Sequence, residues 1–176
     1  MRKLKITELN RISPEDFKKA EKIPLVVVLD NVRSLHNVGS VFRTSDAFLA
    51  EAVYLCGITA TPPHAEIHKT ALGAENSVNW KYFTTTLEAI QELRQQGYVL
   101  AAVEQAENSI SLDELRLENK KYALILGNEV HGVAQEVMNL CDFCIEIPQF
   151  GTKHSLNVSV TAGIVIWESF KKLTNK

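Results

Sequence analysis

The chain has 176 residues, of which 45% are hydrophobic and 23% charged, and its formal net charge at pH 7 is −2. A chain of this length can bury a sizeable core as one domain, and its composition excludes the highly charged, disordered class. No run approaches the ~18 to 20 apolar residues of a transmembrane helix, and the first ten residues lack the apolar run of a signal peptide. With three cysteines, too few for a disulfide framework, we expect a cytoplasmic protein without membrane contact.

Any affinity for nucleic acid must come from a local patch, because the net charge is weakly negative. The first 22 residues carry seven basic and four acidic side chains, a surplus of three positive charges. Within them, Ser13 followed by Pro14 predicts a short helix that ends near Glu21. The segment is either a basic patch for nucleic acid or an ordinary solvated helix.

Apolar runs alternate with helical patterns along the rest of the chain. Residues 25–29 form a continuous β-branched run, which is typical of a strand covered on both faces. The alternation predicts an α/β domain with a mostly parallel six-stranded sheet flanked by helices. The irregular residues 57–69 are expected to be a loop that touches substrate. Further strands are predicted at residues 53–56, 80–83, 98–103, 122–126 and 143–147, and helices at 40–49, 87–96, 134–140 and 156–173.

Several common signatures of α/β enzymes are missing. The sequence lacks G-x-G-x-x-G, G-x-x-x-x-G-K-[ST] and G-x-S-x-G, which disfavours dinucleotide oxidoreductases, P-loop NTPases and serine hydrolases. His64 and His68 have the spacing of a metal pair, but two prolines precede them and no third ligand lies nearby in sequence. Cys141 and Cys144 enter an apolar strand, where free cysteine is usually a small core residue. We therefore expect no metal.

Polar residues follow the first strand, where ligand sites of open α/β sheets gather. Asn37 and Arg43 lie near the start of a helix, whose free N–H groups favour anions such as phosphate. The alternative roles are a helix cap for Asn37 and a surface ion pair for Arg43.

Two later segments have the same position after a strand. In residues 127–132, two glycines permit close approach of the backbone to a ligand, and Glu129 lies either in a cofactor loop or on an exposed tight turn. Ser155 and Asn157 open the last helix, where capping alone nearly explains them.

Taken together, the three segments resemble a known family. Asn37-x-Gly39-x-x-x-Arg43, then GNEVHG at residues 127–132, then Ile147-Pro148 with SLNVS at 155–159 are similar to the three motifs of SpoU-type RNA 2′-O-methyltransferases of the SPOUT superfamily. Residues 69–74 resemble a substrate-side segment of TrmH-like members. The resemblance divides the chain into a short basic N-terminal extension with a helix, residues 1–23, and a SPOUT methyltransferase catalytic domain, residues 24–176.

The resemblance implies a SPOUT-type α/β fold with a C-terminal trefoil knot, which pattern and composition could never predict because true knots are so rare. It also implies a homodimer, and S-adenosylmethionine held bent in the knot as methyl donor. Gly127, Ile147 and Leu156 are assigned to the cofactor, with Glu104 as a weaker candidate.

The implied reaction is methyl transfer to a ribose 2′-hydroxyl of structured RNA. Arg43 would be the central catalytic residue, with Asn37, Glu129, Ser155 and Asn157 around the ribose and phosphate. The family's proposed proton acceptor is this arginine, yet a guanidinium is charged at neutral pH and must first lose a proton. Equally, Arg43 would bind a phosphate and stabilise the developing alkoxide, while Glu129 or water relays the proton.

The substrate is expected to be RNA and not DNA, because the 2′-hydroxyl distinguishes the two. We expect tRNA ahead of rRNA, since the candidates for RNA contact are few: the basic extension, residues 64–69 and Lys153-His154. Two alternatives stay open. One is a catalytically silent RNA-binding or ribosome-assembly protein with the same fold, and the other is a small-molecule enzyme that uses the same strand-end pocket.

Overall fold

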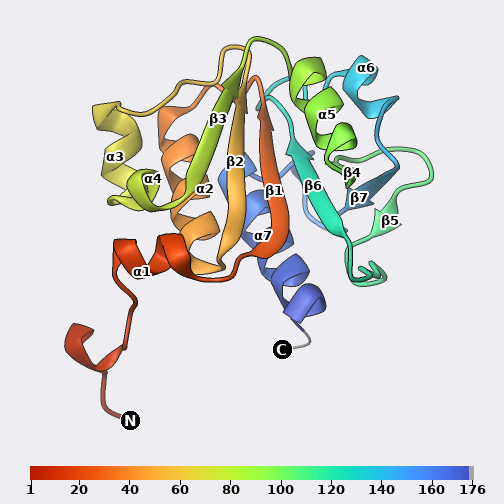
Figure 1. Ribbon diagram of the computed structural model, residues 1–176. Helices are drawn as coiled ribbons and strands as arrows, with labels where there is room; N and C mark the ends of the chain where they lie inside the picture. Colours follow the sequence, from red (N-terminus) through yellow and green to blue (C-terminus); the bar gives the residue numbers. More distant parts are fainter. Residues whose placement is uncertain (175–176) are drawn as a thin grey trace.

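The computed structural model describes residues 1–174, which form a parallel sheet between two layers of helices (Figure 1). The strand order is β3-β2-β1-β6-β4-β7-β5, and every neighbouring pair is parallel. The predicted parallel α/β fold is therefore confirmed. The sheet has seven strands where six were expected, because β5 has two residues, too few for an apolar pattern. The strands are β1 (Ile23–Asp30), β2 (Ala50–Cys56), β3 (Asn79–Phe83), β4 (Tyr98–Val103), β5 (Ile110–Ser111), β6 (Lys121–Leu126) and β7 (Phe143–Glu146).

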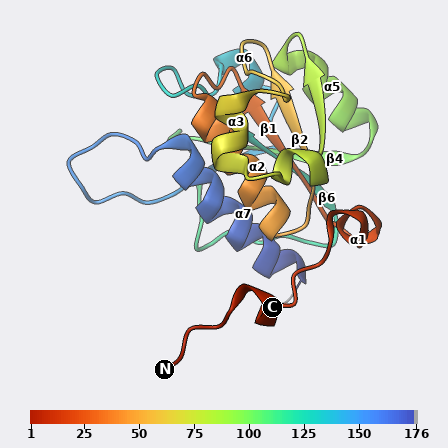
Figure 2. The same ribbon diagram turned by 90° about the vertical axis from the view of Figure 1, so that its left-hand side faces the viewer.

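The helices cover both faces of this sheet. Figure 2 shows α2, α3 and α7 on the side that faces the viewer, and α5 lies on the opposite face with α6. Within residues 1–174, no helix is both long and apolar enough to cross a membrane. The helices are α1 (Pro14–Lys19), α2 (Leu35–Ala47), α3 (Ala65–Ala71), α4 (Ala74–Ser77), α5 (Thr86–Gln95), α6 (Gln135–Met138) and α7 (Val158–Thr174), with a short 3₁₀ helix at Ile6–Glu8.

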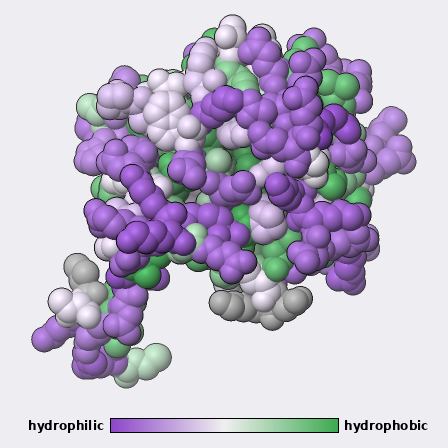
Figure 3. Space-filling view, viewed as in Figure 1, coloured by the Kyte–Doolittle hydropathy of each residue, from purple (hydrophilic) through white to green (hydrophobic). Residues whose placement is uncertain are grey.

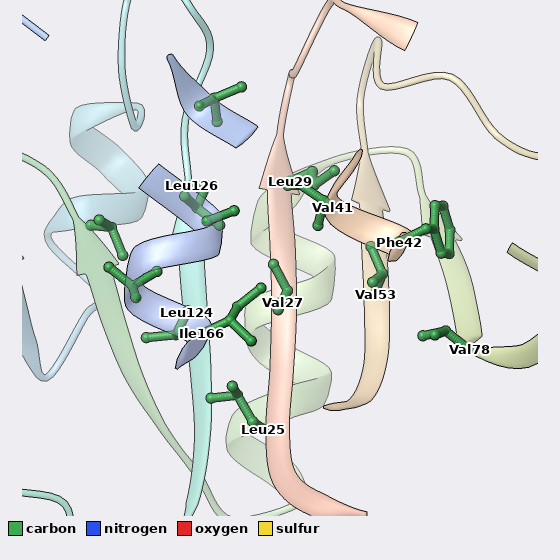
Figure 4. Close-up of a cluster of buried hydrophobic side chains, with 14 of the residues drawn as sticks. Leu25, Val27, Leu29, Val41, Phe42, Val53, Val78, Leu124, Leu126 and Ile166 are labelled. Carbon is green, nitrogen blue, oxygen red and sulfur yellow. The ribbon is translucent and has the colours of Figure 1, made fainter. Parts of the chain in front are cut away.

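The central strand β1 is buried on both faces, as its continuous apolar run predicted. Leu25, Val27 and Leu29 point toward α2 and α7, where they pack with other buried side chains (Figure 4). Val26 and Val28 belong to the core on the α5 side. Each such side chain contributes roughly 1.5 to 3 kcal/mol through burial, so the middle of the sheet is a rigid platform for the loops at its ends.

Strands β6, β4 and β7 end at the same level of the sheet as β1. Leu29 is paired with Leu126 of β6, and Leu126 with Val103 of β4, while Val103 is paired with Ile145 of β7. Because all four strands are parallel, the loops that follow them emerge side by side at one edge. Three segments far apart in sequence meet there.

The chain crosses the sheet after β4. Strand β6 inserts between β1 and β4, β7 lies beyond β4, and α7 then returns to pack against α2 and β1. The strand order alone does not show a chain threaded through a loop, so the knot implied by the resemblance stays a prediction.

Helix α2 begins at Leu35, five residues before the predicted start at residue 40. Ser34 is its N-cap, accepting a hydrogen bond from the backbone N–H of Asn37. Gly39 lies inside the helix, one residue before the predicted start. Its function is close packing, since a Cβ there would come within 2.2 Å of Thr70 Oγ1 in α3.

The predicted irregular loop over residues 57–69 is wrong in its second half. Helix α3 begins at Ala65, and His64 caps it by accepting a hydrogen bond at Nδ1 from the backbone N–H of Glu66, at 3.1 Å. The helix ends at Leu72, a C-cap in the left-handed conformation. Seven residues after two prolines are too few to show helical periodicity in the sequence.

The other predicted boundaries agree within about two residues, except that β2 begins at Ala50, three residues before the predicted start at residue 53. The first helix ends at Lys19 and not near Glu21, and α6 is shorter than the predicted 134–140. The last helix begins at Val158 and not at residue 156, because the side chain of Asn157 caps it.

Candidate active site

A cavity of about 590 Å³ opens at the carboxyl ends of β4, β6 and β7. Its wall is partly apolar, and its polar groups come from the loops that follow the three strands and from the start of α7. Ligand sites of α/β sheets are expected at this edge. The lining residues are Val103, Glu104, Gln105, Leu126, Gly127, Asn128, Glu129, Val130, His131, Gly132, Ile145, Ile147, Gln149, His154, Ser155, Leu156, Asn157, Val158 and Thr161.

Seven of the nine candidate residues from the sequence line this cavity. All four cofactor candidates are among them, contributed by the loops after β4, β6 and β7 and by the segment before α7. The other three are Glu129, Ser155 and Asn157. Residues chosen from three separate motifs thus lie around one space.

The loop after β6 is a tight closed turn. The backbones of Asn128 and Gly132 exchange two hydrogen bonds, at 3.0 and 2.9 Å. Gly132 has a φ of +68°, a conformation that favours glycine, and a Cβ there would lie 2.1 Å from Glu104 Oε2. A Cβ on Gly127 would strike the backbone of Gly132 at 2.0 Å. The two glycines let the turn fold back over the cavity.

Glu104 joins the loops after β4 and β6. Its carboxylate accepts hydrogen bonds from the backbone N–H groups of Gln105, at 2.9 Å, and Val133, at 3.2 Å. The side chain is half-buried and lines the cavity. A carboxylate held at a strand end has lone pairs left for a hydroxyl group of a ligand.

Glu129 fastens the β6 loop to the start of α2. Oε1 accepts hydrogen bonds from the backbone N–H of Ser34, at 2.9 Å, and from Asn37 Nδ2, at 3.1 Å, while Oε2 accepts from the backbone N–H of Arg33, at 3.0 Å. Burial raises the pKa of this carboxyl, but the three donors outweigh it and hold the pKa below its usual value. Glu129 is therefore ionised at neutral pH, at a helix N-terminus that favours negative charge.

Asn37 connects the first motif to both others. It is 8% exposed, donates from Nδ2 to Glu129 and accepts at Oδ1 from Asn157 Nδ2, at 3.2 Å. Asn157 in turn caps α7, because its Oδ1 accepts from the backbone N–H groups of Ser159 and Val160. The capping role expected for Asn157 is present, and the same amide also reaches Asn37. Asn37 itself is not the cap of its helix, which is Ser34.

Residues 148–157 form a loop that protrudes from the body beside the cavity (Figure 2). Ser155 and Leu156 lie at its end and are exposed. Gln105 Nε2 donates a hydrogen bond to the backbone oxygen of His154, which ties this loop to the one after β4. The cavity wall is thus partly exposed loop and partly buried strand.

Arg43 lies apart from the other candidates. It is exposed on α2 and does not line the cavity, and within residues 1–174 it makes no ion pair or side-chain hydrogen bond. Six residues after Asn37, it is about 9 Å further along the helix axis and roughly 120° around it. The surface ion pair considered from sequence is absent among these residues, and the guanidinium is free to bind an anion.

Two residues that the sequence did not single out hold the same loops in place. Asp30, 2% exposed at the end of β1, accepts hydrogen bonds from Thr86 Oγ1, at 2.5 Å, and from the backbone N–H of Ala134, at 3.0 Å. Asn128 donates to the backbone oxygen of Asn31 at 2.8 Å. The signal for Asp30 was a charged residue directly after a buried apolar run, since such a group needs partners.

The two residue pairs with metal-like spacing have other partners. His64 caps α3, and His68 Nδ1 lies 2.5 Å from Glu75 Oε1. Burial raises the pKa of the Cys141 thiol to about 11 and also raises that of Cys144, so both are thiols at neutral pH and not metal-binding thiolates. Among residues 1–174, no group of three or more His, Cys, Asp or Glu side chains is placed to hold a metal ion.

The arrangement suits binding and alignment of a flat, partly polar ligand. Apolar side chains, among them Ile147 and Leu156, offer contact to a ring, and the exposed loops carry hydrogen-bonding groups. A preformed pocket of this kind accelerates a transfer reaction mainly by holding two reactants in near-attack geometry.

Comparison with known proteins agrees with this geometry. The model of the SpoU rRNA methylase family matches residues 24–167. The 23S rRNA (guanosine-2′-O-)-methyltransferase RlmB of Nitrosomonas europaea is 34% identical over 169 residues, which is 95% of this chain and 64% of that protein. The chain therefore spans somewhat less than two thirds of this relative's length.

Two solved structures share the fold. The TrmH/SpoU tRNA modifying enzyme of A. aeolicus superposes with a TM-score of 0.81 at 25% identity, over 92% of this chain and 83% of that one. The AdoMet-bound rRNA methyltransferase of Sinorhizobium meliloti gives 0.80 at 27% identity, over 92% and 61%. Since the family model covers most of the chain and carries all three motifs that meet at the cavity, this protein belongs to the SpoU rRNA methylase family.

Proposed function

We propose that this protein transfers a methyl group from S-adenosylmethionine to a ribose 2′-hydroxyl of RNA. One observation carries the proposal, namely that Asn37 hydrogen-bonds both Glu129 and Asn157, so the three motifs meet beside one cavity. The family supports RNA methylation, and the relative from Nitrosomonas is named for a 2′-O reaction on guanosine.

The residues of the cavity fit the proposed cofactor. Its size is within the ~300 to 1,000 Å³ of small-molecule sites. Ile147 and Leu156 would contact the adenine ring, Gly127 would let the backbone approach it, and Glu104 would accept a hydrogen bond from a ribose hydroxyl. When bound, S-adenosylmethionine supplies an electrophilic methyl group. The related rRNA methyltransferase from Sinorhizobium was solved with this cofactor, which supports the assignment.

Among the reaction residues, Glu129 is proposed as a positioning residue. Its carboxylate already accepts three hydrogen bonds and its pKa is low, so it is a poor acceptor for a further proton. It holds Asn37 and the start of α2 against the cofactor loop. Ser155 and Asn157 line the cavity and would orient the ribose, leaving the hydroxyl proton to water or to the RNA phosphate.

Arg43 is proposed to bind the RNA phosphate next to the reacting ribose and to stabilise the alkoxide. It lies outside the cavity of its own chain, so a further element must bring it to the reaction. Helix α7, which packs against α2, exposes an apolar stripe of Val160, Ile164 and Trp167. We propose that two copies associate through this stripe as a homodimer, which would set Arg43 beside the partner.

The proposed dimer makes a direct prediction. Trp167 is 46% exposed, and Trp167→Glu would place a charge in an apolar interface. Light scattering should then show a dimer for the natural protein and a monomer for the variant. A monomeric natural protein would contradict this part of the proposal.

The first substrate class to test is tRNA, ahead of rRNA. Support comes from the tRNA modifying enzyme of A. aeolicus, which this chain matches over most of both lengths. We also retain the division into a basic extension, residues 1–23, and a catalytic domain, residues 24–176. Support for that boundary comes from the family model, which begins at residue 24.

The test incubates the protein with labelled S-adenosylmethionine and with total RNA from cells that lack it. The expected result is label in RNA, mapped as a 2′-O-methyl group by resistance of the linkage to alkali. RNA binding without transfer would instead indicate a silent RNA-binding or ribosome-assembly protein. Turnover of the donor independent of RNA would indicate a small-molecule enzyme, and both results would overturn the proposal.

A further inference from the structure

A second cavity, of about 650 Å³, lies at the β3 edge of the sheet, away from the loops after β4, β6 and β7. It is formed by the turn before α3, by α3 and α4, and by one residue of the edge strand. No residue of the first cavity contributes to it. The lining residues are Pro62, Pro63, His64, Ala65, His68, Glu75, Asn76 and Trp80.

Strand β3 presents two aromatic side chains on the face toward this cavity. Trp80 pairs with Val53, which packs in the α2 core, so Trp80 points to the side of α2, α3 and α4. Tyr82, two residues on, shares that face. They are 38% and 45% exposed, and Tyr82 is fixed because its hydroxyl donates to the backbone oxygen of Gly57 at 3.0 Å. Residues of intermediate hydropathy, drawn pale, gather over β3 in the space-filling view (Figure 3).

Polar groups are set into the same wall. The Glu75 side chain is 7% exposed and pairs with His68, and it also accepts a hydrogen bond from the backbone N–H of Gly73. His64 uses Nδ1 to cap α3, which leaves its other ring nitrogen for a ligand. The Asn76 side chain makes no hydrogen bond within residues 1–174 and lines the cavity. Amide groups of this kind recognise the edges of nucleobases, adenine above all.

The second cavity is coupled to the first through α2. Thr70 of α3 donates a hydrogen bond to the backbone oxygen of His36, and Glu66 of α3 pairs with the His36 ring at 2.9 Å. His36 is directly followed by Asn37, which contacts Glu129 and Asn157. Helix α3, which lines the second cavity, is therefore held against the start of α2 beside the first cavity.

Positive charge lies beside the second cavity. Helix α1 packs against α4, and Figure 1 draws α1 directly below it. Lys18 and Lys19 of α1 are exposed and, within residues 1–174, have no ion pair. A chain of phosphates that runs over α1 would bring its bases to α4 and Trp80.

We propose that the cavity formed by Pro62, Asn76 and Trp80 binds an unpaired nucleobase of the RNA, stacked on Trp80, at a distance from the methylated nucleotide. The inference rests on the proposed function for the presence of RNA. An exposed aromatic ring beside amide and imidazole groups, with lysines nearby, is the combination that single-stranded RNA sites use. This second contact would select RNA in which an unpaired base lies at a fixed separation from the reacting ribose.

The experiment measures binding of two fluorescent oligoribonucleotides of equal length, one of adenosines and one abasic, to the full chain without cofactor. Trp80→Ala should weaken binding of the adenosine oligomer roughly tenfold. Trp80→Phe keeps a stacking surface and should restore most of the affinity. Leu140→Ala is the control, because Leu140 is 39% exposed and Trp80 is 38% exposed. This variant should leave the affinity for the adenosine oligomer unchanged.

The abasic oligomer separates stacking from charge. None of these variants should change its affinity, whereas Lys18→Gln with Lys19→Gln should weaken both oligomers and reduce the salt dependence. The inference is overturned if Trp80→Ala binds the adenosine oligomer as the natural protein does, if it loses both oligomers equally, or if the natural protein binds neither.

Failure of this inference is distinct from failure of the proposed function. Methyl transfer to RNA with unchanged affinity in Trp80→Ala leaves the activity standing and removes the base site. Loss of adenosine binding in Trp80→Ala, with no transfer by the natural protein, leaves the base site standing and removes the activity. Thermal unfolding of each variant confirms that Trp80, on an edge strand, was replaced without loss of the fold.

Discussion

The two cavities are built in opposite ways. The first is lined by the loops after three strands and by the start of α7, and hydrogen bonds from Asn37 to Glu129 and Asn157 hold two of these segments to α2, up to 120 residues away. The second is formed within residues 62–80, by two short helices and the edge strand. The first cavity therefore depends on long-range contacts of carboxylates and amides. The second depends on local chain geometry and exposed aromatic rings.

This difference suggests a division of labour. Groups fixed before the ligand arrives are suited to chemistry, because they need not reorganise during the reaction. Exposed rings and a free amide are suited to recognition of a flexible strand. Substitutions at the first cavity should therefore change rate or cofactor affinity, and substitutions at the second should change RNA affinity.

The largest effect is expected for Arg43→Lys. A lysine cannot form the two parallel hydrogen bonds of a guanidinium with a phosphate, and loss of one such contact in a transition state lowers rates by about 100- to 1,000-fold. Methyl transfer measured at saturating RNA should fall by that factor, while calorimetry should show unchanged S-adenosylmethionine affinity. Arg116→Lys, at another exposed arginine, is the control. An equal loss of cofactor binding would contradict the assigned role.

The next effect is expected for Gly132→Ala. The new Cβ would lie 2.1 Å from Glu104 Oε2, and the residue would have to keep a φ of +68°. Strain of this kind costs about 1 to 3 kcal/mol, so S-adenosylmethionine binding should weaken roughly 10- to 100-fold. Gly151→Ala is the matched control, since a Cβ there meets no atom within 4 Å. Equal affinities of the two variants would show that the turn does not shape the cofactor site.

The strands, and the edge of the sheet where the site lies, could be predicted from the sequence. Continuous β-branched runs such as residues 25–29 have one common explanation, burial in a parallel sheet, and parallel strands bring their following loops to one edge. Periodicity failed where elements are short, as for the two residues of β5 and the seven of α3. It also placed the start of α2 after Gly39, although this glycine lies inside the helix and packs against α3.

The contacts between the motifs could not be predicted from the sequence. Nothing in the spacing of Asn37, Glu129 and Asn157 shows that their side chains touch, because that depends on the register of β1, β6 and β4. The motif grouping also implied that Arg43 lies with them, whereas helix geometry places it on another face. Local patterns fix which residues are polar at a strand end, and the sheet decides which of them meet.

An intermediate effect is expected for Glu129→Gln. The amide has one acceptor oxygen in place of two, so the N–H of Arg33 or of Ser34 loses its partner. The rate of methyl transfer should fall about tenfold, because Asn37 is then no longer held in place. A positioning role leaves the shape of the pH profile of the rate unchanged. Disappearance of a protonation step from that profile in the variant would instead identify Glu129 as the proton acceptor.

Stability gives a second measurement of the same residue. Because the pKa of Glu129 is lower in the folded state, its ionised form stabilises the fold above the usual glutamate pKa of about 4.3, and this contribution is lost as the pH falls through the lowered value. The difference in urea midpoint between the natural protein and Glu129→Gln should be largest near pH 7 and shrink below pH of about 4. A difference in urea midpoint that does not change with pH would contradict the stabilising role of the ionised Glu129 carboxylate.

The smallest effect is expected for Glu75→Gln at the second cavity. Burial raises the pKa of Glu75, but the hydrogen bonds from His68 and from backbone N–H groups together outweigh it and hold the pKa below its usual value. Glutamine keeps one acceptor for His68, which is largely exposed, so the free energy of unfolding should fall by only about 0.5 to 1 kcal/mol. The loss should diminish below pH of about 4, as for Glu129. S-adenosylmethionine affinity, measured by calorimetry, should stay constant, because within residues 1–174 the Glu75 side chain hydrogen-bonds only to His68 of α3 and to the N-cap of α4. A change in that affinity would show that the two cavities are more tightly coupled than their separate construction implies.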